Sequence, residues 1–197
     1  MKRIILLATM ALISVAGTTM YAQKGNPANT AVDKKVQKEA KKAKARAEEE
    51  ALEQASYQLA LEALKNKQFV LEADRVIFRN GMSTFVTSNT NFVLMDKNKS
   101  TVQVAFNTAY PGPNGIGGVT VDGNTSNLKI SIDKKGNVNY SFNAQGIGIS
   151  AQIFITMTSG SNKATVTVNP NFSNRTLTLT GEIVPLELSN LFKGRSW

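Results

Sequence analysis

Apolar and polar side chains alternate with a period of two along most of the chain after Phe69, as they do in strands with one buried face. The longest alternation places these residues on one face: Ile149, Ala151, Ile153, Ile155 and Met157. Similar runs recur at hairpin spacing, with turn signals such as Asn80-Gly81 between them. The pattern predicts about nine antiparallel strands.

Two places interrupt the alternation. In the first run the apolar positions move from Ala73 to Val76, a shift that a strand absorbs with a bulge near Asp74. Later, Asp122-Gly123 matches a hairpin turn, so we expect two strands between Val119 and Ile132.

The opposite face of these strands carries Ser, Thr and Asn, so one surface of the sheet is solvated, which antiparallel sheets permit. No helix-length segment interrupts the strands, which excludes βαβ crossovers. We expect a mainly β fold, an antiparallel barrel-like curled sheet of about eight to nine strands, with a β-sandwich as the alternative. Large rings predict a filled interior: Phe69, Phe78, Phe92, Phe106, Tyr140 and Phe142.

The segment before the strands is rich in Lys, Ala and Glu and contains neither Gly nor Pro, which predicts one long helix. We expect its second half to dock on the barrel through an apolar face made of Leu52, Ala55, Leu59, Leu61, Ala63 and Leu64. At the other end of the chain, Pro185 should open a short helical turn through Leu191 and Phe192. That turn, or the docked helix, could plug an open end of the barrel.

The predicted organisation has four parts. They are a signal peptide at 1–22, a flexible linker at 23–32, the charged helix at 33–67 and the antiparallel β domain at 68–197. The first part has the layout of a secretory signal, with Lys2 and Arg3 before a short apolar run and a small or polar exit up to Ala22. Cleavage after Ala22 or Ala16 would leave an exported, periplasmic or secreted chain. The apolar run is shorter than the roughly 20 residues of a membrane-spanning helix, so we expect no span in the mature protein.

The first half of the helix is basic and then acidic, with lysines followed by Glu48, Glu49 and Glu50. One interpretation is a solvated helix whose charges neutralise each other. The other is an arm that binds an anionic surface such as an acidic glycan or lipid headgroup. Nucleic acid is disfavoured, because no aromatic residue lies among the lysines to stack on bases.

Composition removes several chemistries. The 197 residues include no Cys and no His, and the formal net charge is +9. Disulfides, lipid attachment through Cys, Ser-His-Asp triads and His-bearing zinc or iron centres are therefore excluded. We expect no cofactor and no metal.

Carboxylates are the remaining groups for acid–base chemistry. Glu72 and Asp74 lie two apart on the polar face of the first strand, a spacing that could serve glycosidase-type chemistry. Acids on a solvated strand face are more often surface charge, so a hydrolase is a distant third hypothesis. Asp96, Asp122 and Asp133 fall at expected turns, where Asp bonds to nearby backbone, and calcium binding is the weaker interpretation.

The loop at 107–118 contains two prolines and four glycines, so it continues neither strand nor helix. It lacks a Gly-Lys-Ser/Thr ending and leads into a strand, which argues against a phosphate loop. Two interpretations remain: a structural loop at the barrel edge, or a preorganised rim that binds a ligand. The candidate ligand-binding residues are Asn107, Tyr110, Asn114 and Gly115.

The stretch from about Leu61 to Lys193 resembles the secreted Bacteroidetes proteins that share domain of unknown function 4251. The matching segments are KNKQFVLEADRV at 65–76, FVTSNTNFV at 85–93, VQVAFN with YPGPNGIGGVTVDG at 102–123, DKKGNV at 133–138 and NFSNRTLTLTGEIVPLELSNLFKG at 171–194. The resemblance implies a periplasmic or otherwise exported location in a Gram-negative bacterium. It implies no activity and no catalytic residue.

These observations favour an exported, non-enzymatic β-barrel-like module that binds a small apolar or glycan-like ligand, or an envelope partner, through the loop at 107–118. A structural cell-envelope protein with a basic helical arm is the alternative.

Overall fold

The computed structural model describes residues 27–106 and 112–196, and the side chains of its helix from Lys34 onward. The predicted signal peptide and its cleavage sites lie outside this range. The chain divides into two compact units, Met1–Ala43 and Lys44–Trp197. The second unit contains the end of the helix and the whole sheet.

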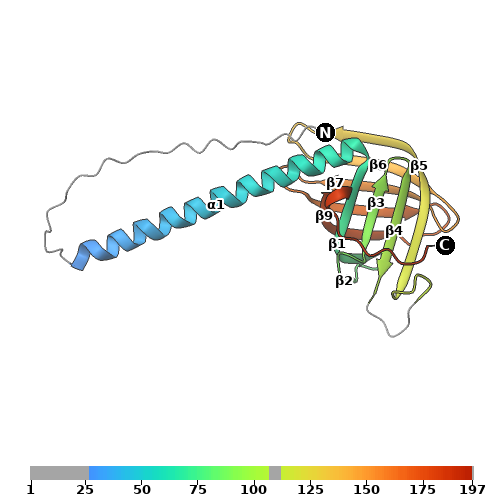
Figure 1. Ribbon diagram of the computed structural model, residues 1–197, viewed down its shortest axis with the longest axis horizontal. Helices are drawn as coiled ribbons and strands as arrows, with labels where there is room; N and C mark the ends of the chain where they lie inside the picture. The colour runs from blue at the N-terminus through green and yellow to red at the C-terminus, as the bar shows by residue number, and fades with distance from the viewer. Residues whose placement is uncertain (1–26, 107–111, 197) are drawn as a thin grey trace, which may run out of the picture. The chain divides into compact units, whose positions relative to one another are not determined.

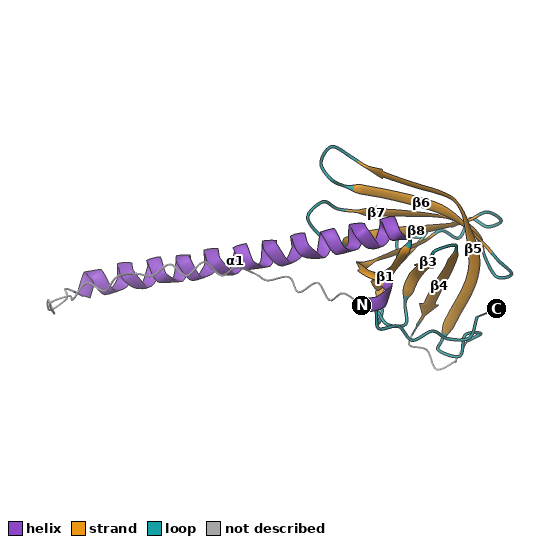
Figure 2. Ribbon diagram, turned by 45° about the horizontal axis from the view of Figure 1, so that its top comes forward, coloured by secondary structure: helices purple, strands orange, loops and turns teal. Residues whose placement is uncertain are grey.

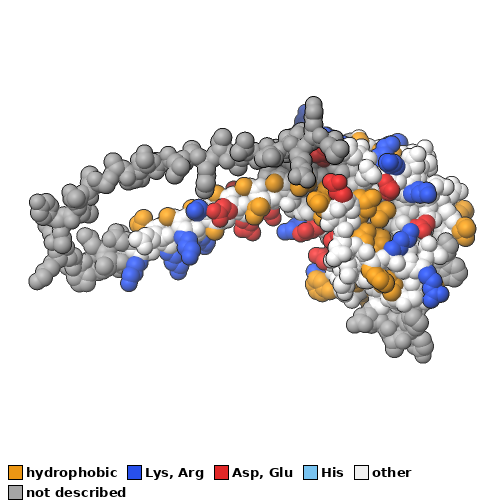
Figure 3. All heavy atoms as spheres, viewed as in Figure 1, with side chains coloured by type: hydrophobic (Ala, Val, Ile, Leu, Met, Phe, Trp, Pro, Cys, Tyr) orange, Lys and Arg blue, Asp and Glu red, His pale blue; other side chains and the backbone are white. Residues whose placement is uncertain are grey.

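Helix α1 spans Pro27–Asn66 and begins six residues before the expected start at 33. Proline suits the first turn of a helix, where its missing N–H group has no partner to lose. The helix ends where Lys67 takes a left-handed conformation with φ 57°. Side chains from Lys34 to Ala55 are exposed, and Figure 3 shows basic residues (blue) followed by acidic ones (red) along this stretch.

Nine strands follow in the described part of the chain. They are β1 (Gln68–Phe78), β2 (Ser83–Phe85), β3 (Phe92–Asp96), β4 (Lys99–Ala105), β5 (Gly118–Ile132), β6 (Val138–Gln145), β7 (Ser150–Met157), β8 (Lys163–Pro170) and β9 (Leu177–Pro185). The order is β2-β1-β3-β4-β5-β6-β7-β8-β9, and β9 also pairs with β1. This pairing closes eight antiparallel strands into the barrel of Figure 2, with β2 as an extra strand. The predicted barrel is confirmed, and the sandwich alternative is not what forms.

Strand β1 uses one edge for two partners. Its first part, Gln68–Glu72, pairs with β3, whereas Arg75–Ile77 pairs with β2. The register against β9 shifts between Ala73 and Arg75. This irregularity confirms the bulge that the shifted alternation predicts.

Strand β5 corrects one prediction. Asp122-Gly123 is not a turn, because Gly123 lies inside a continuous strand and pairs with Ser100 of β4. The strand pairs with β4 up to Asn124 and with β6 from there onward. It bends around Asn127, whose φ is 53°. The two expected strands are therefore two halves of one strand with different neighbours.

The barrel interior is filled by the alternating apolar face, as predicted for five of the six large rings. Phe69, Tyr140 and Phe142 are fully buried there, and Phe78 and Phe106 are half-buried against the same core. Phe92 is the exception. It is buried, but its neighbour Val93 faces the core, so Phe92 lies on the outer face of β3.

The C-terminal segment explains why that outer face is buried. After the short turn η1 (Leu186–Leu188), the chain runs extended across the outside of β1, β3 and β4, as Figure 1 shows in dark red. Its backbone N–H groups donate to Glu72 and Gln103 side chains and to the Asn89 and Asn114 carbonyls. The expected helical turn through Phe192 does not form, and this segment covers a side of the barrel instead of plugging an end.

Helix α1 covers one end of the barrel with its last ten residues. Tyr57, Ala60, Ala63 and Leu64 are buried in the core. Leu52 and Leu59 are exposed, so the docking face is shorter than the apolar pattern predicts.

Candidate functional site

The two ends of the barrel are built differently. Because neighbouring strands run in opposite directions, the β3–β4, β5–β6 and β7–β8 connections share the end covered by α1. The β1–β2, β4–β5, β6–β7 and β8–β9 connections share the other end, which we call the mouth. Ligand sites of small barrels are commonly at such a mouth.

Aromatic rings fill the middle of the barrel. The rings of Phe69 and Tyr140 meet edge to face with centroids 5.4 Å apart, and Tyr140 lies 6.1 Å from Phe142. The Tyr140 hydroxyl donates to the sulfur of Met95 over 3.1 Å. Burial raises the pKa of Tyr140, so the phenol stays protonated. This level of the interior is a packed core.

Apolar side chains become half-exposed toward the mouth. Phe78 and Leu177 face each other across β1 and β9, and the ring of Phe78 lies 5.8 Å from that of Phe106. A cleft of about 870 Å³ opens beside them. Its lining residues are Phe78, Arg79, Asn80, Ser173, Asn174, Arg175, Thr176 and Leu177.

Two turns hold the arginines of this mouth cleft. Gly81 has φ 82° and its N–H donates to the Phe78 carbonyl over 2.9 Å, while the Met82 N–H donates to Asn80 Oδ1 over 3.1 Å. The predicted Asn-Gly hairpin therefore forms and presents Arg79. On the other side, the Arg175 N–H donates to the Ser173 hydroxyl over 3.2 Å.

Both arginines of the mouth cleft are exposed. Among the described residues, the ion pairs are Lys44–Glu48, Lys163–Glu53 and Lys193–Asp122, and none of them includes Arg79 or Arg175. The residues that line the cleft include no carboxylate. The cleft thus combines an apolar wall with two guanidinium groups, which suit carboxylate, sulfate or phosphate oxygens.

The predicted site residues fall into two groups. Asn107 and Tyr110 lie outside the described residues. Asn114 is buried, and its carboxamide oxygen accepts hydrogen bonds from the N–H groups of Ile116 and Gly118. Its amide group donates to the Val104 carbonyl and to the Thr120 hydroxyl, so the whole side chain is used inside the protein. Asn114 therefore shapes the loop.

Gly115 is exposed and has φ 79°. The guanidinium of Arg195 lies beside it, 3.7 Å from where a Cβ atom would stand. Asn114 thus holds the described part of the predicted loop in shape, and the C-terminal segment lies beside it. The mouth cleft, by contrast, is formed by residues that were not among the predicted site residues.

A buried polar network fastens the C-terminal segment. The Gln103 carboxamide accepts from the Thr120 hydroxyl over 2.7 Å and from the Gly194 N–H over 2.8 Å. It donates to the carbonyls of Thr90 and Phe192 over 2.9 and 2.8 Å. All four hydrogen-bonding positions are satisfied, as a fully buried amide requires.

Lys193 pairs with Asp122 at the end of this network, with 2.8 Å between Nζ and Oδ1. Partial burial of Asp122 raises its pKa. Hydrogen bonds from Lys193, Thr101 and Ser196 and the charge of Lys193 outweigh burial, and the pKa lies below its ordinary value. The carboxylate is a structural anchor for the tail.

The carboxylates considered for hydrolysis have separate structural partners. Glu72 Oε1 accepts from the Asn190 N–H over 3.3 Å, and Asp74 Oδ1 accepts from the Thr180 hydroxyl over 3.3 Å. The Arg75 guanidinium lies over the Phe85 ring, 4.5 Å from its centroid. In residues 27–106 and 112–196, no three Asp or Glu side chains gather to hold a metal ion.

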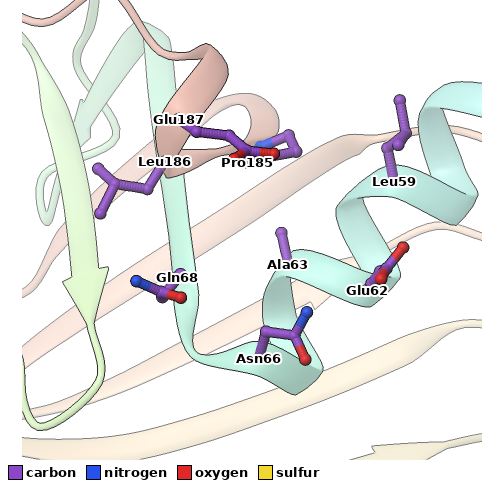
Figure 4. Close-up of a pocket in the computed structure, with 8 residues that line it drawn as sticks. All are labelled: Leu59, Glu62, Ala63, Asn66, Gln68, Pro185, Leu186 and Glu187. Carbon is purple, nitrogen blue, oxygen red and sulfur yellow. The ribbon is translucent and has the colours of Figure 1, made fainter. Parts of the chain in front are cut away.

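A second cleft lies between the end of α1 and the segment after β9 (Figure 4). It measures about 340 Å³ and is lined by Leu59, Glu62, Ala63, Asn66, Gln68, Pro185, Leu186 and Glu187. Its charged lining residues are both acidic, so it does not match an anionic ligand. The mouth cleft is more than twice as large and has the more apolar lining, so it is the stronger candidate site.

No helix in the described part of the chain combines the length and apolarity needed to cross a bilayer. No curated protein matches the sequence. A crystal structure of a DUF4251 family protein from Bacteroides eggerthii DSM 20697 is 65% identical over 75% of this chain and 99% of that chain, with a TM-score of 0.63. The profile of the family described as "Domain of unknown function (DUF4251)" matches residues 51–183. The chain therefore belongs to the DUF4251 family.

Proposed function

We propose that this protein is an exported, non-enzymatic β-barrel module that binds a small amphipathic anion in the mouth cleft. The observation that carries the proposal is the pairing of an apolar wall, Phe78 and Leu177, with two arginines, Arg79 and Arg175, in one cleft of about 870 Å³. Clefts of a few hundred to about 1,000 Å³ hold ligands of ordinary metabolite or lipid size.

The lining chemistry favours binding over catalysis. The mouth cleft contributes amides, hydroxyls and guanidinium groups but no carboxylate, and the sequence contains neither His nor Cys. General acid–base or nucleophilic catalysis usually depends on such groups. Guanidinium groups on two separate turns instead suit the recognition of an anionic head, with the apolar part of the ligand against Phe78.

The proposed ligand contacts differ from those predicted. Asn114 and Gly115 belong to the described part of the loop between β4 and β5, whereas the proposed contacts come from Phe78 and Leu177 at the ends of β1 and β9 and from the arginines on the adjoining connections. The N-terminal sequence supports a periplasmic or secreted location, because Lys2 and Arg3 precede an apolar run with a small-residue exit. Fractionation of the native host, with the mature N-terminus determined by mass spectrometry, tests that location.

A fluorescent anion tests the mouth cleft. Anilinonaphthalene sulfonate combines a sulfonate with an apolar ring system and is titrated against the mature protein. The double variant Arg79→Gln/Arg175→Gln should bind the probe about tenfold more weakly, since it loses two charge-assisted contacts. The matched control Lys134→Gln/Lys135→Gln removes the same charge at the helix end and should leave binding unchanged. Equal affinity of all three proteins would contradict the proposal.

The alternative is a structural envelope protein that uses the basic helix. The stretch of α1 from Lys34 to Arg46 supports it, because its basic side chains are exposed. Replacing Lys34, Lys35, Lys38, Lys41 and Lys42 by Gln should then release the protein from isolated envelopes. Under the leading proposal the same variant keeps its affinity for the sulfonate probe.

A further inference from the structure

The mouth carries exposed apolar side chains on neighbouring connections. Ile147, in the β6–β7 turn, is 95% exposed, and Phe172, in the β8–β9 loop, is 91% exposed. The β1–β2 hairpin adds Met82, 64% exposed, and Phe85, 76% exposed. These four side chains, which we call the mouth tips, come from strands that follow one another around the barrel from β6 through β9 to β1 and β2. Single exposed apolar side chains are ordinary, whereas several at one end of a barrel make that end a candidate interaction surface.

Local structure holds the mouth tips outward. The Gly146 N–H donates to the Ile149 carbonyl over 2.7 Å, and Ile149 is half-buried against the core. Ile149 packs against the core from this tight turn, and Ile147 lies at the exposed tip of the turn. In the β8–β9 loop, the Asn171 N–H and side-chain amide both donate to Ser150, at 2.8 and 2.9 Å. Phe172 follows this anchor directly and projects into solvent.

Charge at the mouth has one sign. The described residues of the four mouth connections carry Arg79 and Arg175 and no carboxylate. Arg75 lies over the ring of Phe85, and Arg195 stands beside Gly115. The helix end, by contrast, mixes acids and bases in its connections, with Asp133 next to Lys134 and Lys135. In the described mouth connections, the apolar tips are therefore accompanied by positively charged side chains and by no negatively charged ones.

We propose that the mouth docks on the surface of a lipid bilayer that contains anionic phospholipids. Ile147 and Phe172 enter the boundary between headgroups and acyl chains, and Arg79 and Arg175 bind lipid phosphates. A protein partner is less well matched, because the mouth tips stand on separate turns instead of forming the closely packed apolar core of a protein interface. A ligand in the mouth cleft would compete with lipid phosphates for Arg79 and Arg175, so the docking is tested through Ile147 and Phe172, which do not line the cleft.

Vesicle flotation tests this docking with variants that change the apolar tips and leave the net charge of the protein unchanged. The mature protein should float with vesicles of phosphatidylglycerol and phosphatidylcholine, and much less with vesicles of phosphatidylcholine alone. Ile147→Ser/Phe172→Ser should bind the anionic vesicles about tenfold more weakly. Leu188→Ser removes an exposed apolar side chain at the helix end and should bind like the wild type. Since α1 is also basic, unchanged binding of the tip variant would assign binding to the helix and overturn the proposal.

A tryptophan probe gives an independent readout. In a Trp197→Phe background, Phe172→Trp should shift its emission to the blue on anionic vesicles and be quenched by lipids with brominated acyl chains. Leu188→Trp is the control and should be neither shifted nor quenched. A wild-type protein that does not bind anionic vesicles would overturn the proposal. Tip variants that change the oligomeric mass and leave vesicle binding unchanged would also overturn it and would mark the mouth as a protein interface.

Discussion

The hydroxyl of Tyr57 donates to the carbonyl of Gly136 over 2.6 Å, joining α1 to the β5–β6 turn. Tyr57 is buried, so the bond is shielded from water. Tyr57→Phe should lower the free energy of unfolding by about 1 kcal/mol, the usual net value of one hydrogen bond. Tyr57→Ala should lower it by about 3 kcal/mol, since the ring contacts are also lost. Urea unfolding measures both, with exposed Leu52→Ala as the control; equal stability of all variants would show that α1 does not cap the barrel.

Gln103 is the centre of the network that holds the C-terminal segment. Gln103→Ala leaves the Gly194 N–H and the Thr90 and Phe192 carbonyls without their partner. We expect a loss of about 3 kcal/mol in unfolding free energy, and faster trypsin cleavage after Lys193. The exposed Gln152 of β7 provides the matched variant Gln152→Ala, which should behave as wild type. Unchanged cleavage would mean that other contacts hold the tail.

Asp122 makes stability depend on pH. Its folded-state pKa is lowered from the ordinary 3.8, so the folded state holds the proton less tightly than the unfolded chain. The stability it contributes is present above 3.8 and is lost as pH falls through the folded-state pKa. The difference in unfolding free energy between wild type and Asp122→Asn should therefore be complete at neutral pH and shrink below 3.8. Exposed Glu187→Gln is the comparison, and a difference that stays constant with pH would refute this role.

Gly181 permits the β1–β9 pairing that closes the barrel. A Cβ atom at this position would overlap the carbonyl oxygen of Glu72 on β1. Gly181→Ala should therefore cost about 3 kcal/mol or more, because backbone must move apart. Gly81→Asn is the control. No atom lies within 4 Å of its Cβ position, and Asn tolerates a positive φ, so the cost should stay below about 1 kcal/mol. Equal melting temperatures of the two variants would contradict the claim that Gly181 permits the pairing that closes the barrel.

Alternation predicts the strands well, because each strand has one face on the core. Alternation does not reveal whether the outward face of a strand is also buried, beneath another segment of the chain. Phe92 shows this limit: its burial comes from the C-terminal segment, which lies nearly 100 residues further along the chain. Likewise, Gly123 resembles a turn residue locally, yet its pairing with Ser100 of β4 keeps it inside β5.

The residues that line the mouth cleft lie far apart in the sequence, so no single local pattern predicts the cleft. Arg79 and Arg175 line one cleft only because β1 pairs with β9, the first and last strands of the barrel. Asn114 stood out in a loop of unusual composition, but that composition reflects a shaped turn filled by its own hydrogen bonds. The Asn80-Gly81 signal was the one local clue, since it predicted the hairpin that presents Arg79.

Native mass spectrometry of the mature protein, purified gently from its own envelope, tests most directly whether the barrel binds a small amphipathic anion. The proposal predicts a reproducible added mass on the wild type that is absent from Arg79→Gln/Arg175→Gln and present on Lys134→Gln/Lys135→Gln. A bare wild-type mass, or an added mass that survives removal of both mouth arginines, would contradict it.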